Sequence, residues 1–214
     1  VDSFLATSGR EFRGEDSKTT SFAQRLWIST TNKWGPNALE AIKNQKPPVT
    51  RLNLHDLIEA PVDWETLEQG IHGQKARVEK KKIYPHVFEV RDKVVEYFKE
   101  NERGRLIMAC GTGKTMTSLK IAEKQTNNKG TILFLVPSIA LIGQTLREWT
   151  SQAEEPINPI CICSDPEITK NKNSADQDLT STIDLAWPAS TDANYILKQF
   201  EHYKQNSNAA MTVV

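Results

Sequence analysis

Residues 3–60 alternate between short β-rich runs and stretches with helical periodicity. The run VTRLNL alternates along its length, which predicts a strand. In the stretch PNALEAIKNQ, Ala38, Leu39 and Ile42 form one helical face behind a proline at a suitable first helical position. An alternation of strands and helices is typical of a parallel sheet. The expected elements are strand 24–30, helix 36–45, strand 49–54 and helix 55–60, which ends at Pro61.

The second half of the chain repeats this alternation with longer elements. A helix is expected from residue 84, because Val87, Val90, Val94 and Tyr97 recur at helical spacing. The run TILFLVP is almost wholly apolar, which is typical of a central parallel strand covered on both faces. After the first helix we expect strand 105–109, helix 114–126, strand 131–137, helix 138–150, strand 159–165, helix 192–205 and a strand that begins at Met211.

Residues 69–83 (QGIHGQKARVEKKKI) interrupt the pattern and hold little that could form a core. The basic residues in this stretch could contact a phosphate backbone, or they could lie on a solvated connector; they are Lys75, Arg77, Lys80, Lys81 and Lys82. We therefore expect a domain at 1–68, a linker at 69–83 and a second domain at 84–214.

Composition adds few constraints. The chain has 27 basic and 27 acidic residues, so bulk charge indicates no particular partner. The three cysteines, two of them in a Cys-x-Cys, suggest reduced thiols in a cytoplasmic protein, and their spacing does not predict a metal site. No apolar run approaches the roughly 18 residues of a membrane span. The chain begins with Val1 and ends in a strand-like MTVV, so we expect it to be a piece of a longer protein.

The stretch LIMACGTGKTMTSLKIAEK carries the clearest chemistry. A strand, a glycine-rich turn and a helix N-terminus present free backbone amides to an anion. In this pattern the lysine reaches the terminal phosphates of ATP, and the Thr115 hydroxyl holds Mg²⁺. A glycine-rich turn with an exposed lysine is the alternative that needs no ligand. The residues expected to bind ATP and Mg²⁺ are Gly111, Thr112, Gly113, Lys114, Thr115 and Met116.

The loop lacks the first glycine of G-x-x-x-x-G-K-[ST], because position 108 is methionine. The pattern A-x-x-G-x-G-K-T, followed by LFLVPSIALIGQTLREW and ICSD, resembles superfamily 2 helicases of restriction systems, of the type III restriction subunit class. The resemblance covers about residues 84–214 and implies the N-terminal half of a RecA-like P-loop NTPase domain. It also implies that Ser138 and Gln144, in the helicase motif Ia, contact the DNA backbone. Ser138 could instead only cap a helix, and Gln144 could simply be exposed.

The front of the chain resembles a restriction-endonuclease-like α/β domain of the Mrr type. The resemblance lies in DSFLATSGREF, LWISTTNKWGPNALEAI and DLIEAPVDW. Residues 1–68 would be the C-terminal part of such a domain. The family cuts DNA with an acidic residue and a glutamine-or-glutamate-x-lysine signature that hold Mg²⁺, and these are expected ahead of Val1. No catalytic residue is therefore expected within the chain.

Two further features bear on activity. Relatives of the motor have a Pro-His-Gln adenine motif, whereas this chain has Pro85, His86 and Val87, so adenine selectivity is open and His86 could stack on the base or be an ordinary histidine. The D-E-A-H type motif needed for hydrolysis would follow MTVV. We expect a fragment of an ATP-dependent DNA helicase or translocase of a restriction-modification system that binds nucleotide without turning it over. Its expected partners are double-stranded DNA and methyltransferase or specificity subunits.

Two other classes of protein remain open. A small P-loop kinase would carry the first glycine of the loop and an arginine-bearing lid, and residues 150–200 are poor in arginine. A non-catalytic nucleic-acid-binding module could keep the fold without turnover, and Val87 in place of glutamine keeps that alternative open.

Overall fold

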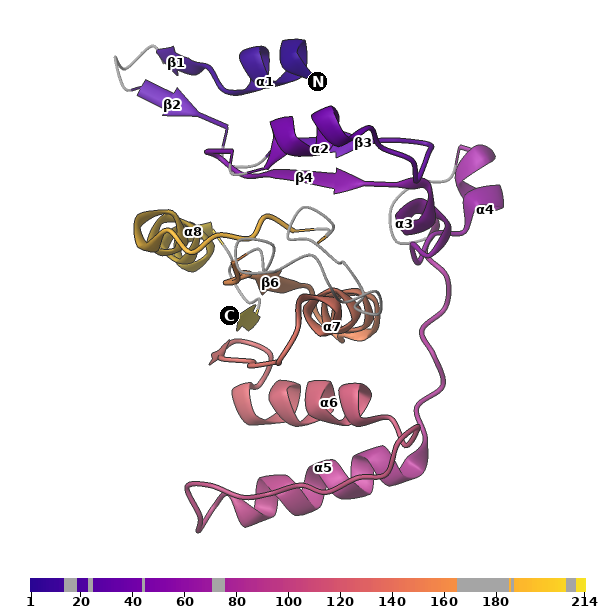
Figure 1. Ribbon diagram of the computed structural model, residues 1–214. Helices are drawn as coiled ribbons and strands as arrows, with labels where there is room; N and C mark the ends of the chain where they lie inside the picture. The colour runs from indigo at the N-terminus through magenta and orange to yellow at the C-terminus, as the bar shows by residue number, and fades with distance from the viewer. Residues whose placement is uncertain are drawn as a thin grey trace, which may run out of the picture. The chain divides into compact units, whose positions relative to one another are not determined.

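The chain is described by a computed structural model (Figure 1), which covers residues 1–13, 19–22, 25–43, 45–70, 76–164, 185, 187–206 and 211–214. Two compact units can be distinguished, each built from several segments. None of the helices in the described ranges has the length and apolarity that a bilayer crossing requires. Unit 1 comprises 1–59, 136–143 and 160–197, and unit 2 comprises 60–135, 144–159 and 198–214.

A parallel pair of strands forms the centre of unit 1 (Figure 1). β3 (Arg25–Ile28) pairs in parallel with β4 (Val49–Leu52), and α2 (Pro36–Ile42) connects them. Proline stands at the start of α2, where its missing N–H costs no hydrogen bond. α3 (Leu54–Ile58) follows β4 directly. The predicted order of strand, helix, strand and helix is therefore confirmed.

The amino-terminal part of unit 1 contains elements that the sequence pattern did not predict. α1 (Asp2–Ser8) is followed by β1 (Glu11–Arg13), which pairs antiparallel with β2 (Thr19–Ser21). The core of the unit is built around Ile42 and Val49, which are both buried. The residues that pack on Ile42 and Val49 come from the region of α1 and from the region of β3 and α2. They are Val1, Phe4, Leu5, Trp27, Trp34 and Leu39.

A buried arginine joins β3 to the turn before β4. Arg25 is 3% exposed, and its Nε donates to the carbonyl oxygen of Pro47 at 3.0 Å. Its guanidinium also donates to Gln45 Oε1 at 3.3 Å. Burial lowers the pKa of Arg25 from its ordinary value, since a charged group is costly in an apolar environment. Hydrogen bonds to oxygen compensate part of that cost.

Unit 2 contains a three-stranded parallel sheet. β7 (Met211–Val213) lies between β5 (Thr131–Ile132) and β6 (Ile157–Pro159). Ile132 is opposite Val213 in one pairing, and Ile157 is opposite Met211 in the other. The strand predicted to begin at Met211 is therefore confirmed and is the middle strand of this sheet.

The predicted long helices all form. The helix expected at 114–126 has both predicted ends, and the other three differ from their predicted bounds by one or two residues. α7 and α8 have residues in both units. The described helices from residue 60 onward are α4 (Trp64–Glu68), α5 (Pro85–Tyr97), α6 (Lys114–Thr126), α7 (Ile139–Gln152) and α8 (Ala193–Asn206).

Three strand predictions need correction. Residues 105–109 lie in a described range but pair with no other described strand, so they form an extended segment and no strand of the sheet. In the run at 131–137, β5 takes up the first two residues, and the Phe134 N–H also donates to the Val214 carbonyl oxygen at 2.8 Å. Leu133 and Leu135 are 67% and 81% exposed, so the run is not covered on both faces. Of the strand expected at 159–165, only Pro159 belongs to β6, which begins two residues earlier, and Cys161 forms an isolated parallel bridge with Ala189.

Part of the predicted linker is anchored to unit 2. Residues 71–75 lie outside the described residues, but Ala76 is buried and its carbonyl oxygen accepts from the Asp63 N–H at 2.8 Å. Further along, Lys80 Nζ donates to the Ala153 carbonyl oxygen at 2.5 Å. The backbone N–H of Lys81 donates to a side-chain oxygen of residue 152. The described part of 69–83 is therefore held at these points, while residues 77–82 are exposed to solvent. The linker and both interpretations of its basic residues stay predictions.

The core of unit 2 packs α5, α6 and α7 against the sheet. The buried apolar residues that form it are Val87, Met116, Leu119, Ala122, Trp149, Ala153, Met211 and Val213. A buried ion pair lies beside this core: Lys120 Nζ is 2.7 Å from Glu123 Oε2 and 3.2 Å from Glu154 Oε1. Glu123 also accepts the backbone N–H of Glu154 at 2.7 Å. This network fixes α6 to the segment that follows α7.

Candidate phosphate-binding site

Two glycines with left-handed backbone form the turn that leads into α6. Gly111 has φ of 76° and Gly113 has φ of 81°, a region that side chains with a Cβ rarely adopt. Gly113 is the N-cap residue of α6, so the helix begins immediately at Lys114. A Cβ built at Gly113 would lie 3.8 Å from a methyl group of Val87, and one at Gly111 would meet nothing within 4 Å. Glycine is therefore required here by conformation more than by space.

The loop presents unpaired amides. Within the described residues, no hydrogen bond has the N–H of Gly111, Thr112 or Gly113 as its donor. The first N–H groups of a helix have no partner inside the helix either. These groups and the positive end of the helix dipole would favour an anion at this place.

Lys114 folds back over the loop. Its Nζ donates to the carbonyl oxygen of Ala109 at 3.1 Å, and the Thr112 hydroxyl donates to the same oxygen at 2.7 Å. Lys114 is exposed, so its ammonium group can exchange this carbonyl for a phosphate oxygen. The lysine and the free amides thus lie on the same short segment, and their binding of phosphate stays a prediction.

Residues in the first turn of α6 contribute both to the candidate site and to the core of unit 2. Met116 is 6% exposed and belongs to the core of unit 2, so its backbone amide, and not its side chain, can face an anion. Thr115 is half-buried, and its carbonyl oxygen accepts from the Trp149 indole N–H at 3.1 Å. Thr117 is fully buried, and its hydroxyl donates to the Gly113 carbonyl oxygen at 3.0 Å. The Thr115 hydroxyl makes no hydrogen bond within the described residues, and a hydroxyl of this kind is a suitable Mg²⁺ ligand.

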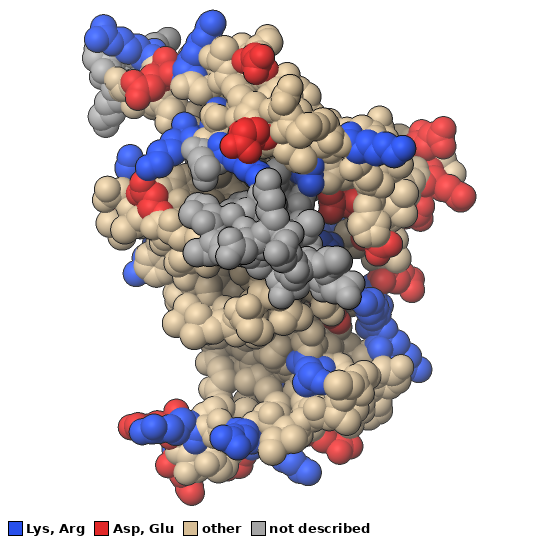
Figure 2. Space-filling model, viewed as in Figure 1, with Lys and Arg blue, Asp and Glu red and all other residues tan. Residues whose placement is uncertain are grey.

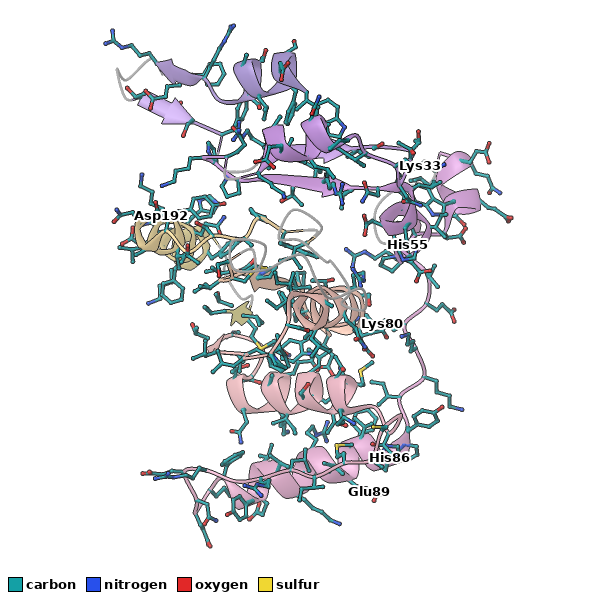
Figure 3. All side chains as sticks on the ribbon, in the orientation of Figure 1. Lys33, His55, Lys80, His86, Glu89 and Asp192 are labelled. Atoms are coloured by element: carbon teal, nitrogen blue, oxygen red, sulfur yellow. The ribbon has the colours of Figure 1, made fainter. Side chains whose placement is uncertain are left out.

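A histidine contacts the loop from α5. His86 Nε2 lies 2.9 Å from the carbonyl oxygen of Thr112, and the imidazole ring stacks on Tyr84 with 5.7 Å between ring centroids. Figure 3 labels His86 at the end of α5 that adjoins this loop. The sequence placed His86 near the nucleotide only through the Pro-His-Gln resemblance. The hydrogen bond to the loop was not predicted, since it depends on how α5 packs beside α6.

Of the two residues expected to contact DNA, Ser138 directly precedes α7 and Gln144 lies within it. The Ser138 Oγ accepts the backbone N–H of Leu141 at 3.3 Å, so Ser138 caps the helix. Gln144 is exposed and makes no side-chain hydrogen bond in the part of the chain that the structure describes. The capping role is confirmed, and the contact with DNA stays a prediction for both residues.

On the face drawn in Figure 2, basic and acidic side chains of the described residues both occur over most of the surface, and several acidic side chains lie together over α4. Among the described residues, no group of three histidine, cysteine or acidic side chains is placed to hold a metal ion.

Cys161 is buried, and burial with the neighbouring Cys163 raises the pKa of its thiol to about 12. That thiol stays protonated and unreactive at neutral pH.

Comparison with known proteins places these features in a family. Residues 1–74 match the family described as a restriction endonuclease, of the Mrr type, and residues 74–213 match the family described as type III restriction enzyme, res subunit. Among curated proteins, no match to the chain was found.

Two solved structures are similar to the chain. One is the ATP-dependent Type ISP restriction-modification enzyme LlaBIII bound to DNA, which is 29% identical over 100% of this chain with a TM-score of 0.77. The other is a nuclease-deletion mutant of the Type ISP restriction-modification enzyme LlaGI in complex with a DNA substrate mimic, which is 38% identical over 63% of this chain with a TM-score of 0.49. The chain spans 13% and 12% of the lengths of these two proteins.

The predicted fold classes are confirmed by these matches: an endonuclease-like α/β region comes first, and a RecA-like helicase region follows. The chain therefore belongs to the type III restriction enzyme res subunit family, with an Mrr-type restriction-endonuclease region ahead of its helicase region.

Proposed function

We propose that this chain is the nucleotide-binding part of an ATP-dependent DNA helicase or translocase in a restriction-modification system. The observation that supports the proposal best is the loop before α6, where two left-handed glycines leave amides free beside an exposed lysine. Lys114 would bind the terminal phosphates of ATP, and the Thr115 hydroxyl would hold Mg²⁺. When bound, Mg²⁺ neutralises charge that develops on the phosphate oxygens. The amides of residues 111–116 would orient the phosphates.

DNA is the second ligand in this proposal. The similar LlaBIII enzyme is described as bound to DNA. In this chain Ser138 and Gln144 would donate to backbone phosphates, which gives position without sequence readout. A capping serine can still do this, because its oxygen accepts from Leu141 while its hydroxyl proton stays free to donate.

Nucleotide binding without turnover is expected for the 214 residues alone. Hydrolysis requires an acidic pair that orients Mg²⁺ and water, and the sequence contains no Asp-Glu dipeptide. Within the whole enzyme we expect ATP turnover that depends on DNA, together with methyltransferase or specificity subunits as partners. The domain limits at 1–68, 69–83 and 84–214 belong to the same proposal.

The decisive experiment is a titration of the chain with ATP and GTP in the presence of Mg²⁺, by calorimetry. We expect the chain to bind ATP and Lys114→Ala to lose most of that affinity. Selectivity for ATP supports the motor, equal affinity for GTP supports another P-loop enzyme, and no binding supports a non-catalytic DNA-binding module. If the 214 residues hydrolyse ATP in the steady state and Lys114→Ala abolishes this hydrolysis, the expectation of binding without turnover is wrong.

A further inference from the structure

The hydrogen bond between His86 and the loop has a defined direction. A carbonyl oxygen can only accept, so His86 Nε2 carries the proton and donates to the Thr112 oxygen, 2.9 Å away. His86 is the second residue of α5, and its ring lies 14° from parallel to that of Tyr84. Stacking on Tyr84 and attachment to the helix both restrict the orientation of the imidazole.

This bond controls a second group on the same peptide. The C=O of Thr112 and the N–H of Gly113 belong to one planar trans peptide unit, so they point in opposite directions. When His86 holds the carbonyl toward α5, the Gly113 N–H must point away from α5. Gly113 has a left-handed backbone and no side chain, so without such a restraint this peptide could rotate.

The neighbouring residue supports the same arrangement. Val87 is 1% exposed and belongs to the core of unit 2. One of its methyl groups lies 3.8 Å from the position that a Cβ on Gly113 would take. The start of α5 therefore adjoins this peptide at two places: His86 is hydrogen-bonded to the Thr112 carbonyl, and the Val87 side chain lies beside the open side of Gly113.

We propose that His86 is a positioning residue of the phosphate-binding loop: by holding the Thr112 carbonyl, it directs the Gly113 N–H toward the phosphates of the nucleotide. This inference rests on the proposed nucleotide binding and adds a role that the Pro-His-Gln resemblance does not assign. His86 acts on the phosphate chain of the ligand. Its removal weakens binding of any polyphosphate that enters the loop, whether or not that ligand carries a base.

The test compares ATP with inorganic tripolyphosphate, which has the phosphates and lacks the base. Both are titrated with Mg²⁺ into the wild-type chain and into His86→Ala, His86→Gln and Glu89→Ala. Glutamine can place an amide N–H near the position of the imidazole Nε2. Glu89 is the matched control, because it is exposed on the same helix and makes no side-chain hydrogen bond or ion pair in the described part of the chain (Figure 3).

We expect His86→Ala to weaken both ligands by a similar factor, roughly five- to tenfold, which is the value of one hydrogen bond. His86→Gln should recover most of the affinity, and Glu89→Ala should match the wild type. Long-range ¹H–¹⁵N spectra of the imidazole should show the Nε2–H tautomer, a readout that does not depend on ligand. Circular dichroism checks that each variant is folded.

The possible failures can be told apart. If His86→Ala weakens ATP and leaves tripolyphosphate unchanged, the ring contacts the base and the positioning role is overturned. If Lys114→Ala loses both ligands and His86→Ala loses neither, the proposed function stands and this inference falls. If the wild-type chain binds neither ligand, the nucleotide site itself is wrong and the role of His86 falls with it.

Discussion

The indole N–H of Trp149 in α7 donates to the carbonyl oxygen of Thr115, 3.1 Å away in the first turn of α6. Trp149 is 1% exposed, and its ring lies 4.9 Å from that of Phe134. The helix that begins at the phosphate-binding loop is thus connected by a hydrogen bond to the helix that carries the expected DNA contacts.

Two replacements of Trp149 distinguish the contribution of this hydrogen bond to stability from the contribution of packing. Trp149→Phe removes the donor and some volume, and should lower the free energy of unfolding by about 1–2 kcal/mol. Trp149→Ala also leaves a cavity and should cost about 3–5 kcal/mol. Urea denaturation followed by circular dichroism measures both. Trp64→Phe is the control, because Trp64 is 47% exposed and the change should have little effect; an equal loss in that variant would argue against a special role for Trp149.

The buried ion pair in α6 should respond strongly to loss of one partner. Lys120 and Glu123 are 3% and 5% exposed, so Lys120→Met leaves a buried carboxylate unpaired and should cost about 3–5 kcal/mol. The double variant Lys120→Met/Glu123→Gln should be more stable than Lys120→Met, because glutamine is neutral and keeps an oxygen for the Glu154 N–H. A double-mutant cycle in urea measures the coupling.

The exposed pair of Lys99 and Glu96 provides the comparison for this cycle. Their side chains are 64% and 72% exposed, so Lys99→Met should change stability by less than about 1 kcal/mol. Additive effects of the two changes at Lys120 and Glu123 would show that burial has not coupled the pair.

A negatively charged substitution distinguishes the capping role of Ser138 from its expected contact with DNA. Ser138→Ala removes the cap and should cost about 1 kcal/mol of stability. Ser138→Asp keeps a capping oxygen but places a negative charge near a phosphate, so it should preserve stability and weaken DNA binding. Gln144→Ala should weaken DNA binding a few-fold and leave stability unchanged, since Gln144 is exposed. Fluorescence anisotropy with labelled duplex DNA reports affinity.

Wild-type DNA affinity in both Ser138→Asp and Gln144→Ala would mean that motif Ia does not contact DNA in this chain. Ser138 would then be a helix cap only.

Cys161 should make stability depend on alkaline pH. Burial raises the pKa of this thiol from 9.0 to about 12 in the folded chain. Between these values the unfolded chain has released the proton and the folded chain retains it, so stability falls as pH rises through this range. Cys161→Ala should lose less stability than the wild type between pH 8 and pH 11, measured in urea. Cys110→Ala, at an exposed thiol, should behave as the wild type. If the wild type, Cys161→Ala and Cys110→Ala show identical dependence of stability on pH, the raised pKa of Cys161 is contradicted.

Local signals in the sequence were sufficient for the loop and the helices. The glycines at 111 and 113 can adopt the left-handed backbone that the turn needs, and Lys114 then starts a helix whose periodicity continues to Thr126. The capping role of Ser138 could also be predicted, because its hydrogen bond to Leu141 spans only three residues.

Features that depend on distant residues could not be predicted in this way. Residues 105–109 have a strand-like sequence, but a strand requires a partner, and none of the described strands pairs with them. Lys120 is an ordinary helix residue in the sequence, and only the packing of α6 shows that it is buried. The contact of His86 with Thr112 likewise follows from the packing of α5 beside α6.

The order of strands in unit 2 has a consequence for synthesis on the ribosome. Each of β5 and β6 hydrogen-bonds to β7 and not to the other, and β7 follows both in the sequence. During translation, β5 and β6 therefore leave the exit tunnel before their common partner exists. Their apolar residues stay open to other contacts until residues 211–213 emerge, and exposed strand segments of this kind are prone to aggregate. Synthesis of β7 is thus the event that allows β5 and β6 to join one sheet.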